Sequence, residues 1–429
     1  MKDMKLKPAK GPVHGELDIP GDKSVSHRGV ILGSLAEGTT KVTNFLTGED
    51  CMRTVNAFKL MGVEIKENGT ELTITSKGYK HFNEPVEPIY FGNSGTTARL
   101  MLGVLAGLPL FTMAYGDASL TRRPMDRVIK PLSEMGASIT GRKNNTYLPL
   151  SVSGGSLKGI NYTLPVKSAQ VKSAILLAGI LAEGETEVIE PTPTRNHSEN
   201  MLEAFGANIS RHNTKITVSK SSLKATDVFV PGDISSAAFF MVAAAIKPGS
   251  SLTLKNVGLN QTRTGIIDVL IEMGASVTIS NQATISGELI GDITVKYGEL
   301  KGATINGDIV PRLIDELPVI ALLATQAEGE TVISDAGELR LKETDRIEAV
   351  VDGLTRLGAN VEATEDGMII KGKSLLHGGQ VKSYYDHRIA MMHAIASLVS
   401  DEEIIIDDVS SVAISYPDFF KDLAHIISE

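Results

Sequence analysis

A repeat of about 70 residues runs through the chain and limits the folds that it can adopt. In each copy an apolar segment ends at a turn and is followed by a stretch rich in Thr or Val. Six such turns occur, at Gly38, Gly107, Gly184, Gly249, Gly329 and Asp401. Successive turns are 69, 77, 65, 80 and 72 residues apart. This period predicts six related structural units.

A second marker in most copies predicts the structure within a unit. A glycine follows an apolar segment at Gly62, Gly136, Gly206, Gly274 and Gly358. Glycine commonly ends a helix, because it adopts the left-handed conformation at low cost. Asn68-Gly69 and Asp366-Gly367 then precede short alternating runs, which is typical of hairpins. Each unit is therefore predicted to be strand, helix, strand, helix and hairpin.

The length of the repeat favours two domains over a solenoid, whose repeats are normally about 20–50 residues long. We expect three units in each domain. Pro20-Gly21-Asp22 and Pro231-Gly232-Asp233 are nearly identical and are candidate hinges. If the chain crosses twice, one domain is 21–231 and the other joins 1–20 to 232–429.

Composition excludes several classes of protein. The net charge of −9 argues against nucleic-acid binding, which normally needs a basic face. A single cysteine excludes a disulfide scaffold and a Cys-rich zinc site. The start of the chain lacks the apolar stretch of a signal peptide, and no apolar run reaches the roughly 20 residues of a membrane span. We therefore expect a soluble, cytoplasmic protein.

The six predicted apolar helices begin at polar residues, as ordinary helix N-caps do. These starts include Asp22, Ser94, Ser168, Asp233, Asp315 and Asp386. Rotationally related units would place the starts on one side of each domain, facing the cleft. Cations lie within the first turns at several of them, namely Lys23, Arg28, Arg99, Lys167, Lys172 and Arg388. Because a cation is unfavourable at the positive end of a helix dipole, this pattern indicates an anionic ligand.

Two other charged segments are candidates for the same site. Arg122 and Arg123 precede a proline, and Arg suits bidentate contacts to carboxylate or phosphate. Lys342 and Arg346 would share one face of a helix, with Glu343 beside them. A solvated surface turn and a solvated helix face remain the alternatives.

Asp315 is a candidate general base, although a helix cap is the simpler interpretation. A cleft rich in cations would lower its pKa and keep it ionised. Lys23 and Glu343 are candidates for a second group that donates a proton. The Gly-x-x-x-x-Gly-Lys-Ser motif does not end at Lys23-Ser24, no Gly-x-Gly-x-x-Gly motif occurs, and the nine His show no metal-ligand spacing. Cys51 is expected to be a packing residue.

Six motifs together resemble the 5-enolpyruvylshikimate-3-phosphate synthase (3-phosphoshikimate 1-carboxyvinyltransferase) family, from about Pro8 to Phe420. They are Lys23-Ser24 with Arg28, Gly92–Thr96, Arg123–Met125, Ser168–Gln170, Lys342–Arg346 and Asp386–Arg388. The resemblance implies a two-domain inside-out α/β barrel of six βαβαββ units, three per domain, with the active site in the interdomain cleft. It implies enolpyruvyl transfer from phosphoenolpyruvate to the 5-hydroxyl of shikimate 3-phosphate, with release of phosphate. This reaction of the shikimate pathway leads to chorismate and the aromatic amino acids. A cytoplasmic monomer without metal or organic cofactor is expected.

The resemblance also implies roles for individual residues. The shikimate 3-phosphate contacts would be Lys23, Ser24, Arg28, Ser168, Ala169, Gln170, Arg195, Asp315 and Lys342. The phosphoenolpyruvate contacts would be Lys23, Gly95, Arg123, Gln170, Arg346 and Arg388. The acid–base groups would be Asp315, Glu343 and Lys23.

Four positions refine the resemblance. Ala169 and Arg195 are similar to the class II branch of the family. Ile414 occupies a position where many members have a phosphoenolpyruvate-binding Lys. Gly95 is associated in the family with room for the herbicide glyphosate, so sensitivity is predicted.

Two alternatives remain open from the sequence. The sister transferase that acts on UDP-N-acetylglucosamine usually has a Cys in a loop that here reads Asp117-Ala118-Ser119. A non-catalytic anion-binding repeat protein is the other alternative. Release of phosphate that requires both small substrates would separate an enzyme from such a protein.

Overall fold

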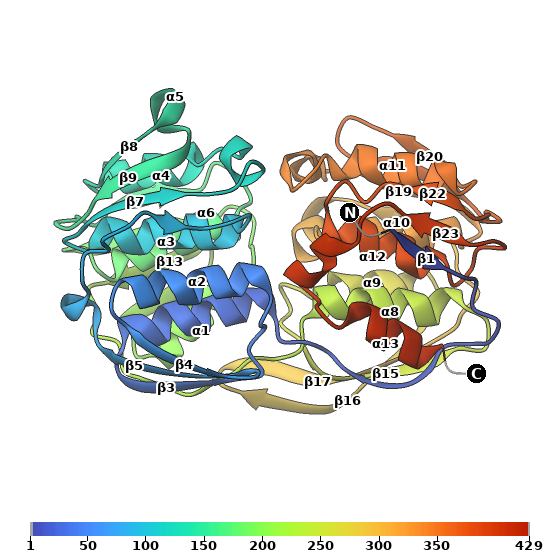
Figure 1. Cartoon of the computed structure of the whole chain (residues 1–429), viewed down its shortest axis with the longest axis horizontal. Helices are drawn as coiled ribbons and strands as arrows, with labels where there is room; N and C mark the ends of the chain where they lie inside the picture. The colour runs from blue at the N-terminus through green and yellow to red at the C-terminus, as the bar shows by residue number, and fades with distance from the viewer. Residues whose placement is uncertain (1–2, 428–429) are drawn as a thin grey trace. The chain divides into compact units, whose positions relative to one another are not determined.

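The computed structural model describes residues 3–427, which divide into two compact units (Figure 1). Unit I comprises residues 21–230 and 285–288. Within the described residues, unit II comprises 3–20, 231–284 and 289–427. Each unit has its own hydrophobic core and three small sheets.

The sheets of unit I have four strands each. Their orders are β14-β3-β5-β4, β6-β7-β9-β8 and β10-β11-β13-β12. The strands are β3 (Glu37–Thr43), β4 (Glu64–Asn68), β5 (Glu71–Lys77), β6 (Ile89–Tyr90), β7 (Phe111–Tyr115), β8 (Ser138–Gly141), β9 (Tyr147–Ser153), β10 (Asn161–Thr163), β11 (Glu185–Ile189), β12 (Ile209–His212), β13 (Lys215–Ser219) and β14 (Val228–Phe229). The main helices are α1 (Lys23–Leu35), α2 (Glu49–Leu60), α3 (Gly95–Gly107), α4 (Asp126–Glu134), α6 (Ala169–Gly179) and α7 (His197–Ala204).

Unit II repeats this plan with one shorter sheet. Its sheet orders are β16-β17-β15-β2, β18-β19-β21-β20 and β1-β23-β22. The strands are β1 (Met4–Leu6), β2 (His14–Asp18), β15 (Ser251–Gly258), β16 (Ser276–Ile285), β17 (Glu288–Lys296), β18 (Thr304–Ile305), β19 (Gly329–Ile333), β20 (Asn360–Ala363), β21 (Met368–Gly372), β22 (Gly379–Val381) and β23 (Ile404–Ile406). The main helices are α8 (Ile234–Ile246), α9 (Gly265–Glu272), α10 (Leu317–Thr325), α11 (Arg346–Arg356), α12 (His387–Ala396) and α13 (Phe419–Ile426).

The sheet that contains β6 illustrates how one repeat folds. β6 runs parallel to β7, and β9 pairs antiparallel with both β7 and β8. The helices α3 and α4 follow β6 and β7 in the chain, so the element order is βαβαββ. The sheets that contain β10 and β18 have the same order, which confirms the predicted unit.

Two sheets receive their first strand from a distant part of the chain. β14 pairs parallel with β3, with Val228 opposite Val42. β2 pairs parallel with β15, with Leu17 opposite Leu254. The chain consequently passes from unit II to unit I after Pro20 and returns after Val230.

The last repeat differs from the prediction, because no hairpin follows α12 and β23. The chain there forms the short helix η5 (Ser410–Ile414) and α13. β1 instead pairs antiparallel with β23, with Met4 opposite Ile406. This strand covers an edge of the sheet that would otherwise expose unpaired backbone groups.

Helices that are apolar on all sides occupy the centre of each unit, with the small sheets outside them (Figure 1). All thirteen residues of α8 are buried, and α10 is buried along its whole length. A helix without a polar face is stable in water only when it is covered on every side. This arrangement confirms the predicted inside-out α/β architecture.

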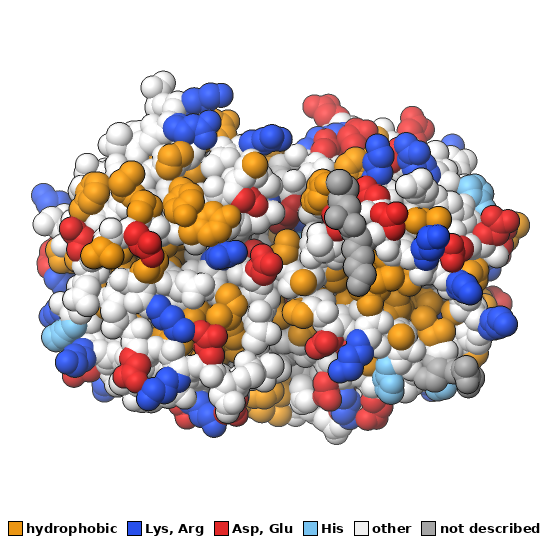
Figure 2. Space-filling view, in the orientation of Figure 1, with side chains coloured by type: hydrophobic (Ala, Val, Ile, Leu, Met, Phe, Trp, Pro, Cys, Tyr) orange, Lys and Arg blue, Asp and Glu red, His pale blue; other side chains and the backbone are white. Residues whose placement is uncertain are grey.

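The outer faces of the sheets differ in polarity. β3 exposes Thr39 and Lys41, whereas β7 exposes Phe111, Met113 and Tyr115 to between 42 and 49%. Figure 2 shows hydrophobic side chains gathered over this part of unit I. Both strands bury the alternate residues, as expected of sheets with one solvent face.

The glycines of the second marker end helices as predicted. Gly62, Gly136, Gly206, Gly274 and Gly358 have φ values between 76° and 102°. In residues 3–427, no helix is both long and apolar enough to span a membrane.

Packing between the buried helices predicts the effect of one added methyl group. A Cβ atom at Gly103 of α3 would lie 2.2 Å from the carbonyl oxygen of Ala174 in α6. We expect Gly103→Ala to lower the free energy of unfolding by about 1–3 kcal/mol, as overpacking does, despite the higher helix propensity of alanine. Urea unfolding measures this change. Gly11→Ala is the control, because its Cβ would meet open space, and an equal effect of both variants would contradict the prediction.

Candidate active site

Side chains cap five of the six apolar helix starts; the exception is α10, whose N-cap is Glu316 without a side-chain cap, so the interpretation of Asp315 as a helix cap is wrong. The carboxylate of Asp22 accepts from the backbone N–H of Val25 at 2.8 Å. Ser94, Ser168, Asp233 and Asp386 cap α3, α6, α8 and α12 in the same way. Capping therefore explains these polar residues, and the neighbouring cations need a separate explanation.

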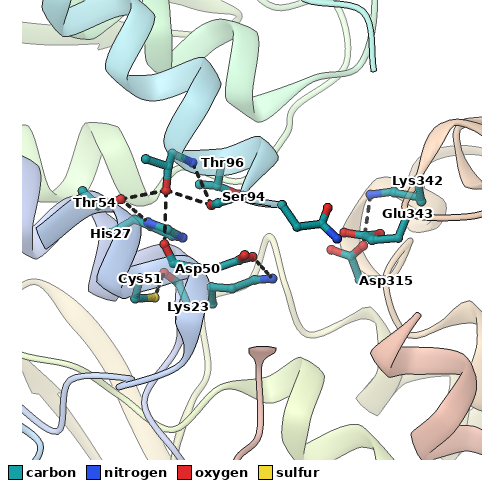
Figure 3. A network of polar contacts seen from close by, with 12 residues as sticks. Lys23, His27, Asp50, Cys51, Thr54, Ser94, Thr96, Asp315, Lys342 and Glu343 are labelled. Atoms are coloured by element: carbon teal, nitrogen blue, oxygen red, sulfur yellow. Dashed lines mark hydrogen bonds and ion pairs between the residues drawn. The ribbon is translucent and has the colours of Figure 1, made fainter. Parts of the chain in front are cut away.

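Lys23 is the first residue of α1 and forms an ion pair with Asp50 (Figure 3). Its Nζ lies 3.1 Å from Oδ2 of Asp50, and the two side chains are 17% and 10% exposed. Asp50 lies in the first turn of α2, where a helix dipole favours a carboxylate. The ammonium group is thus held at a helix start by a carboxylate that the sequence analysis did not identify.

A buried polar network lies beside this ion pair (Figure 3). Nδ1 of His27 lies 2.8 Å from Oγ1 of Thr54, which lies 2.9 Å from Oγ1 of Thr97. Thr97 donates to Oγ of Ser94 at 2.8 Å, so the network connects α1, α2 and α3. Burial lowers the pKa of His27 well below its usual value, and the charges of Lys23 and Arg28 act in the same direction. His27 is therefore neutral at pH 7 and serves as a fixed hydrogen-bonding group.

Arg28 is buried and donates to three oxygen atoms. Its Nε donates to Ser198 Oγ at 2.7 Å and its Nη2 donates to Ser173 Oγ at 2.8 Å. Its Nη1 donates to the carbonyl oxygen of Ser24 at 2.8 Å, while Ser24 itself is half-buried in the first turn of α1. These contacts fix the guanidinium group against α6 and α7.

Arg28 is also electrostatically coupled to other residues of unit I. Burial lowers the pKa of Arg28 to about 10, an effect that the carboxylate of Glu199 opposes. The positive charge of half-buried Arg195 lowers the same pKa further, so the two predicted shikimate 3-phosphate contacts act on one another. Two neighbouring cations attract an anion, because a bound anion reduces the repulsion between them.

The starts of α3 and α6 bring further predicted residues together. Gln170 accepts from Nη1 of Arg99 at 2.5 Å and donates to Thr96 Oγ1 at 3.0 Å. A Cβ atom at Gly95 would lie 3.2 Å from Nη1 of Arg99 and 3.3 Å from Nη1 of Arg123. Gly95, Arg123 and Gln170 therefore surround one location, and the glycine leaves room beside two guanidinium groups.

Arg123 is held in place by the segments on either side of it. Its guanidinium group donates to Ser119 Oγ at 3.1 Å and to the carbonyl oxygen of Asn93 at 3.3 Å. Arg123 is buried, whereas Arg122 is exposed. The solvated-turn interpretation thus holds for Arg122 alone.

Lys172 does not belong to this anion-binding surface, and its interpretation as part of it is wrong. Its side chain is fully buried and forms ion pairs with Glu190 at 2.9 Å and Glu199 at 2.8 Å. Lys172 follows the helix start by a whole turn, so its side chain points into the unit. Lys167, which precedes α6, is exposed.

Unit II has a second cluster, which is built around Arg346; Figure 3 shows three of its members, Asp315, Lys342 and Glu343. The side chain of Arg346 is 2% exposed and donates to three carboxylates. Its Nε lies 2.8 Å from Oδ2 of Asp386, its Nη2 lies 2.7 Å from Oε2 of Glu343, and its Nη1 lies 3.3 Å from Oδ1 of Asp315. Lys342 donates to the same oxygen of Asp315 at 3.0 Å. The structure therefore brings together the predicted residues Asp315, Lys342, Glu343 and Arg346.

The carboxylates determine the charge state of Arg346. Burial alone would lower the pKa of its guanidinium group, but the charges of Asp386, Glu343 and Asp315 more than offset that effect. The pKa is therefore raised above its usual value, and Arg346 is a permanent cation.

The segment around Lys342 is not the single helix that the spacing predicted. A 3-10 helix, η4 (Gly337–Leu341), ends before Lys342, and α11 begins at Arg346. Asp345 separates them, because its side chain caps α11 by accepting from the backbone N–H of Glu348 at 3.2 Å. Lys342 and Arg346 nevertheless meet at Asp315, so the contact is tertiary and does not come from an i,i+4 spacing.

An unusual backbone conformation leads into α12. Tyr384 and Tyr385 have φ values of 56° and 55°, in the left-handed region. Tyr384 is held by a hydrogen bond from its hydroxyl to Asp352 Oδ2 at 2.8 Å. Asp386, which follows Tyr385, is fully buried. Its carboxylate binds Arg346 and accepts from the backbone N–H of Arg388 at 2.9 Å. The left-handed turn thus places the carboxylate of Asp386 beside Arg346.

Two further positions contribute no charge to the clusters, although the thiol of Cys51 lies 3.8 Å from the carbonyl oxygen of Lys23. Ile414 is the last residue of η5 and contributes no charge there. Cys51 is buried in the core of unit I, which confirms it as a packing residue.

A two-unit α/β protein with Lys, Arg and carboxylate side chains gathered at the starts of buried helices belongs to the class of enzymes that bind small anionic metabolites. Comparison with known proteins specifies the family. Residues 8–423 match the family "EPSP synthase (3-phosphoshikimate 1-carboxyvinyltransferase)". The chain belongs to this family.

Individual relatives agree with the family match. A 3-phosphoshikimate 1-carboxyvinyltransferase of Oceanobacillus iheyensis is 57% identical over 428 residues and the alignment covers both chains completely. One from Bacillus thuringiensis subsp. konkukian is 55% identical and is covered, like this chain, to 99%. The solved EPSP synthase of Acinetobacter baumannii has a TM-score of 0.89 at 46% identity, covering 99% of this chain and 98% of its own.

Family membership establishes the reaction. The chain is an enzyme that transfers the enolpyruvyl group of phosphoenolpyruvate to shikimate 3-phosphate in the shikimate pathway. The matches favour this activity over the sister transferase and over a non-catalytic anion-binding protein.

The left-handed conformation of Tyr385 predicts opposite effects of two substitutions. Its side chain is 62% exposed, so little packing is lost on replacement. Asparagine tolerates this conformation, whereas a β-branched residue is strained in it by about 1–2 kcal/mol. We expect Tyr385→Asn to raise, and Tyr385→Val to lower, the free energy of unfolding measured in urea. If both variants changed the free energy of unfolding in the same direction, the left-handed conformation of Tyr385 would be contradicted.

Proposed function

We propose that the two clusters act on one pair of substrates, with shikimate 3-phosphate and phosphoenolpyruvate each bound by residues of both units. For shikimate 3-phosphate these are Lys23, Ser24, Arg28, Ser168, Ala169, Gln170, Arg195, Asp315 and Lys342. For phosphoenolpyruvate they are Lys23, Gly95, Arg123, Gln170, Arg346 and Arg388. The observation that carries the proposal is the buried Arg346, a permanent cation shared by Asp315, Glu343 and Asp386.

The charges of these residues suit two polyanionic substrates. Helix starts favour anions, and cations placed there add to that effect. Lys23 and Asp50 form a balanced ion pair, whereas Arg346 and Lys342 together face the three carboxylates of Asp315, Glu343 and Asp386. An incoming phosphate or carboxylate would compete for the cations, so binding would redistribute existing ion pairs.

The proposed reaction proceeds by addition and elimination. The 5-hydroxyl of shikimate 3-phosphate adds to C2 of phosphoenolpyruvate while C3 receives a proton, which gives a tetrahedral ketal phosphate. Loss of a proton from C3 then expels phosphate and restores the double bond as a vinyl ether. Addition removes a proton from the hydroxyl and adds one to C3, and elimination removes a proton from C3, so the mechanism needs a base near the hydroxyl and an acid near C3 that can take the proton back.

Asp315 is proposed to take the hydroxyl proton and to act again in elimination. Its Oδ1 is bound by both Lys342 and Arg346, which orient the carboxylate. Lys23 and Glu343 are proposed to manage the proton at C3. Closure of the units on the substrates would exclude bulk water from that proton transfer.

We also propose that the enzyme acts as a monomer in the cytoplasm. The proposed substrates are small molecules, and its acidic net charge of −9 is unsuited to nucleic acid. The proposed mechanism uses side chains alone, without metal or organic cofactor. Sedimentation at assay concentrations tests the monomer, and a dimer as the active species would contradict it.

The reaction requires both substrates together. Phosphate release should occur with shikimate 3-phosphate plus phosphoenolpyruvate, and with neither substrate alone. UDP-N-acetylglucosamine should not replace the acceptor. Release with that compound at a similar rate would contradict the assigned specificity.

Replacement of Asp315 tests its role as the base. Asp315→Ala should lower kcat by about 10²–10⁴-fold, the usual contribution of a general base, with KM values changed only severalfold. Phosphate release under saturating substrates measures kcat. Asp268→Ala is the control, because Asp268 also binds an Arg in unit II, at 2.8 Å, but on the surface. A kcat close to that of the unmodified enzyme would disprove the role.

Glyphosate should inhibit the enzyme in competition with phosphoenolpyruvate. Gly95 leaves the space beside Arg99 and Arg123 open, and the methyl group of Gly95→Ala would lie against both guanidinium groups. We expect this variant to need a higher herbicide concentration for half inhibition. An inhibition titration measures both enzymes, and absence of inhibition of the unmodified enzyme at millimolar glyphosate would refute the prediction.

A further inference from the structure

We propose that Lys172, Glu190 and Glu199 position Arg195 for the phosphate of shikimate 3-phosphate by holding both ends of residues 190–199. This inference rests on the proposed function, which assigns Arg195 to that substrate. We call Lys172 with its two glutamates the Lys172 tether.

The tether is a fully desolvated ion cluster. The exposed fractions of Lys172, Glu190 and Glu199 are 0, 7 and 2%. The ammonium group lies 2.9 Å from Oε2 of Glu190 and 2.8 Å from Oε1 of Glu199. Burial of an ion pair contributes little net stability, because desolvation offsets the attraction. The cluster is therefore better explained by the geometry that it imposes than by its contribution to folding.

The two glutamates lie on opposite sides of Arg195 in the chain. Glu190 directly follows β11, and Glu199 lies in the first turn of α7. Between them no regular element supports residues 190–196. One ammonium group on α6 thus joins the beginning and the end of the loop that carries Arg195.

Glu190 also fixes the middle of this loop. Its Oε1 accepts from the backbone N–H of Thr194 at 2.9 Å and from the Thr194 hydroxyl. Thr194 is the residue immediately before Arg195 and is buried. Because Lys172 holds the carboxylate of Glu190 in place, it also fixes the backbone of Thr194, which precedes Arg195. Loss of the ion pair would leave that carboxylate without its countercharge.

The same segment supports Arg28. Ser198, the neighbour of Glu199, accepts from Arg28 and donates to Ser173 Oγ at 2.7 Å. Ser173 donates in turn to the carbonyl oxygen of Ala169 at 2.7 Å, at the start of α6. A movement of residues 190–199 would consequently disturb a second proposed contact of shikimate 3-phosphate.

Electrostatics explains why Arg195 needs such support. Arg195 and Arg28 repel one another, as the effect of Arg195 on the pKa of Arg28 shows. The tether keeps these two like charges close together, so that one phosphate group can bind both.

Lys172→Met tests the tether, because it removes the charge and keeps the length of the side chain. We expect KM for shikimate 3-phosphate to rise about tenfold or more, while kcat and KM for phosphoenolpyruvate change less than about threefold. Lys215→Met is the matched control, since Lys215 pairs with Glu187 at 3.1 Å on the surface of the same unit. This control should leave all three constants unchanged.

Limited trypsin digestion supplies a readout that does not depend on activity. Trypsin cleaves after Arg195 only when residues around it leave their folded position. We expect cleavage between Arg195 and Asn196, identified by mass spectrometry, to be about tenfold faster in Lys172→Met than in Lys215→Met. If Lys172→Met does not fold, Thr194→Val, which removes one donor to Glu190, should show smaller changes in the same directions.

The outcomes separate the tether from the proposed function. Unchanged cleavage in a folded variant overturns the inference, and so does an equal rise of both KM values. Faster cleavage with an unchanged KM for shikimate 3-phosphate overturns the positioning role, leaving a structural one. If the unmodified enzyme fails to use shikimate 3-phosphate, the proposed function fails, while the cleavage comparison still decides whether the tether holds the loop.

Discussion

Burial of helices that have no polar face is the constraint on which the rest of this structure depends. α8 and α10 are covered along their whole length, and α1, α3 and α6 nearly so. In such helices every polar group needs a partner inside the protein, and the first N–H groups at each helix start need one as well. Polar and charged residues are therefore concentrated at the helix starts, and the site follows from the way in which the core is built.

Cations at those starts are stable because carboxylates balance them. Asp50 neutralises Lys23, and Asp315, Glu343 and Asp386 more than neutralise Arg346. A cation at the positive end of a helix would otherwise be unfavourable. The ion pairs hold the cations in a fixed geometry. The phosphate and carboxylate groups of the proposed substrates would take the place of some of these carboxylates as partners of the cations.

Much of the fold could be predicted from the sequence, because its signals are local and repeated. Glycines such as Gly62 and Gly136 ended helices where expected, and the polar residues before α1, α6 and α12 capped them. The structure differs from the sequence-based prediction where contacts with other segments override the local pattern. β1 replaced the expected hairpin beside β23, and Asp345 ended one helix and began another within a run of charges that local spacing made continuous.

The repeat, the element order of a unit, the family and most members of the two charged clusters could be recognised in the amino-acid sequence alone. These properties depend on the order of residue types, which the chain displays directly. The folded structure was needed to show that Lys172 is internal, that Lys342 and Arg346 meet at Asp315, and that Asp50 pairs with Lys23. The reason is that a charged residue is written identically in a sequence whether it is solvated by water or paired with a buried counterion. In addition, the paired residue lies many positions away in the chain.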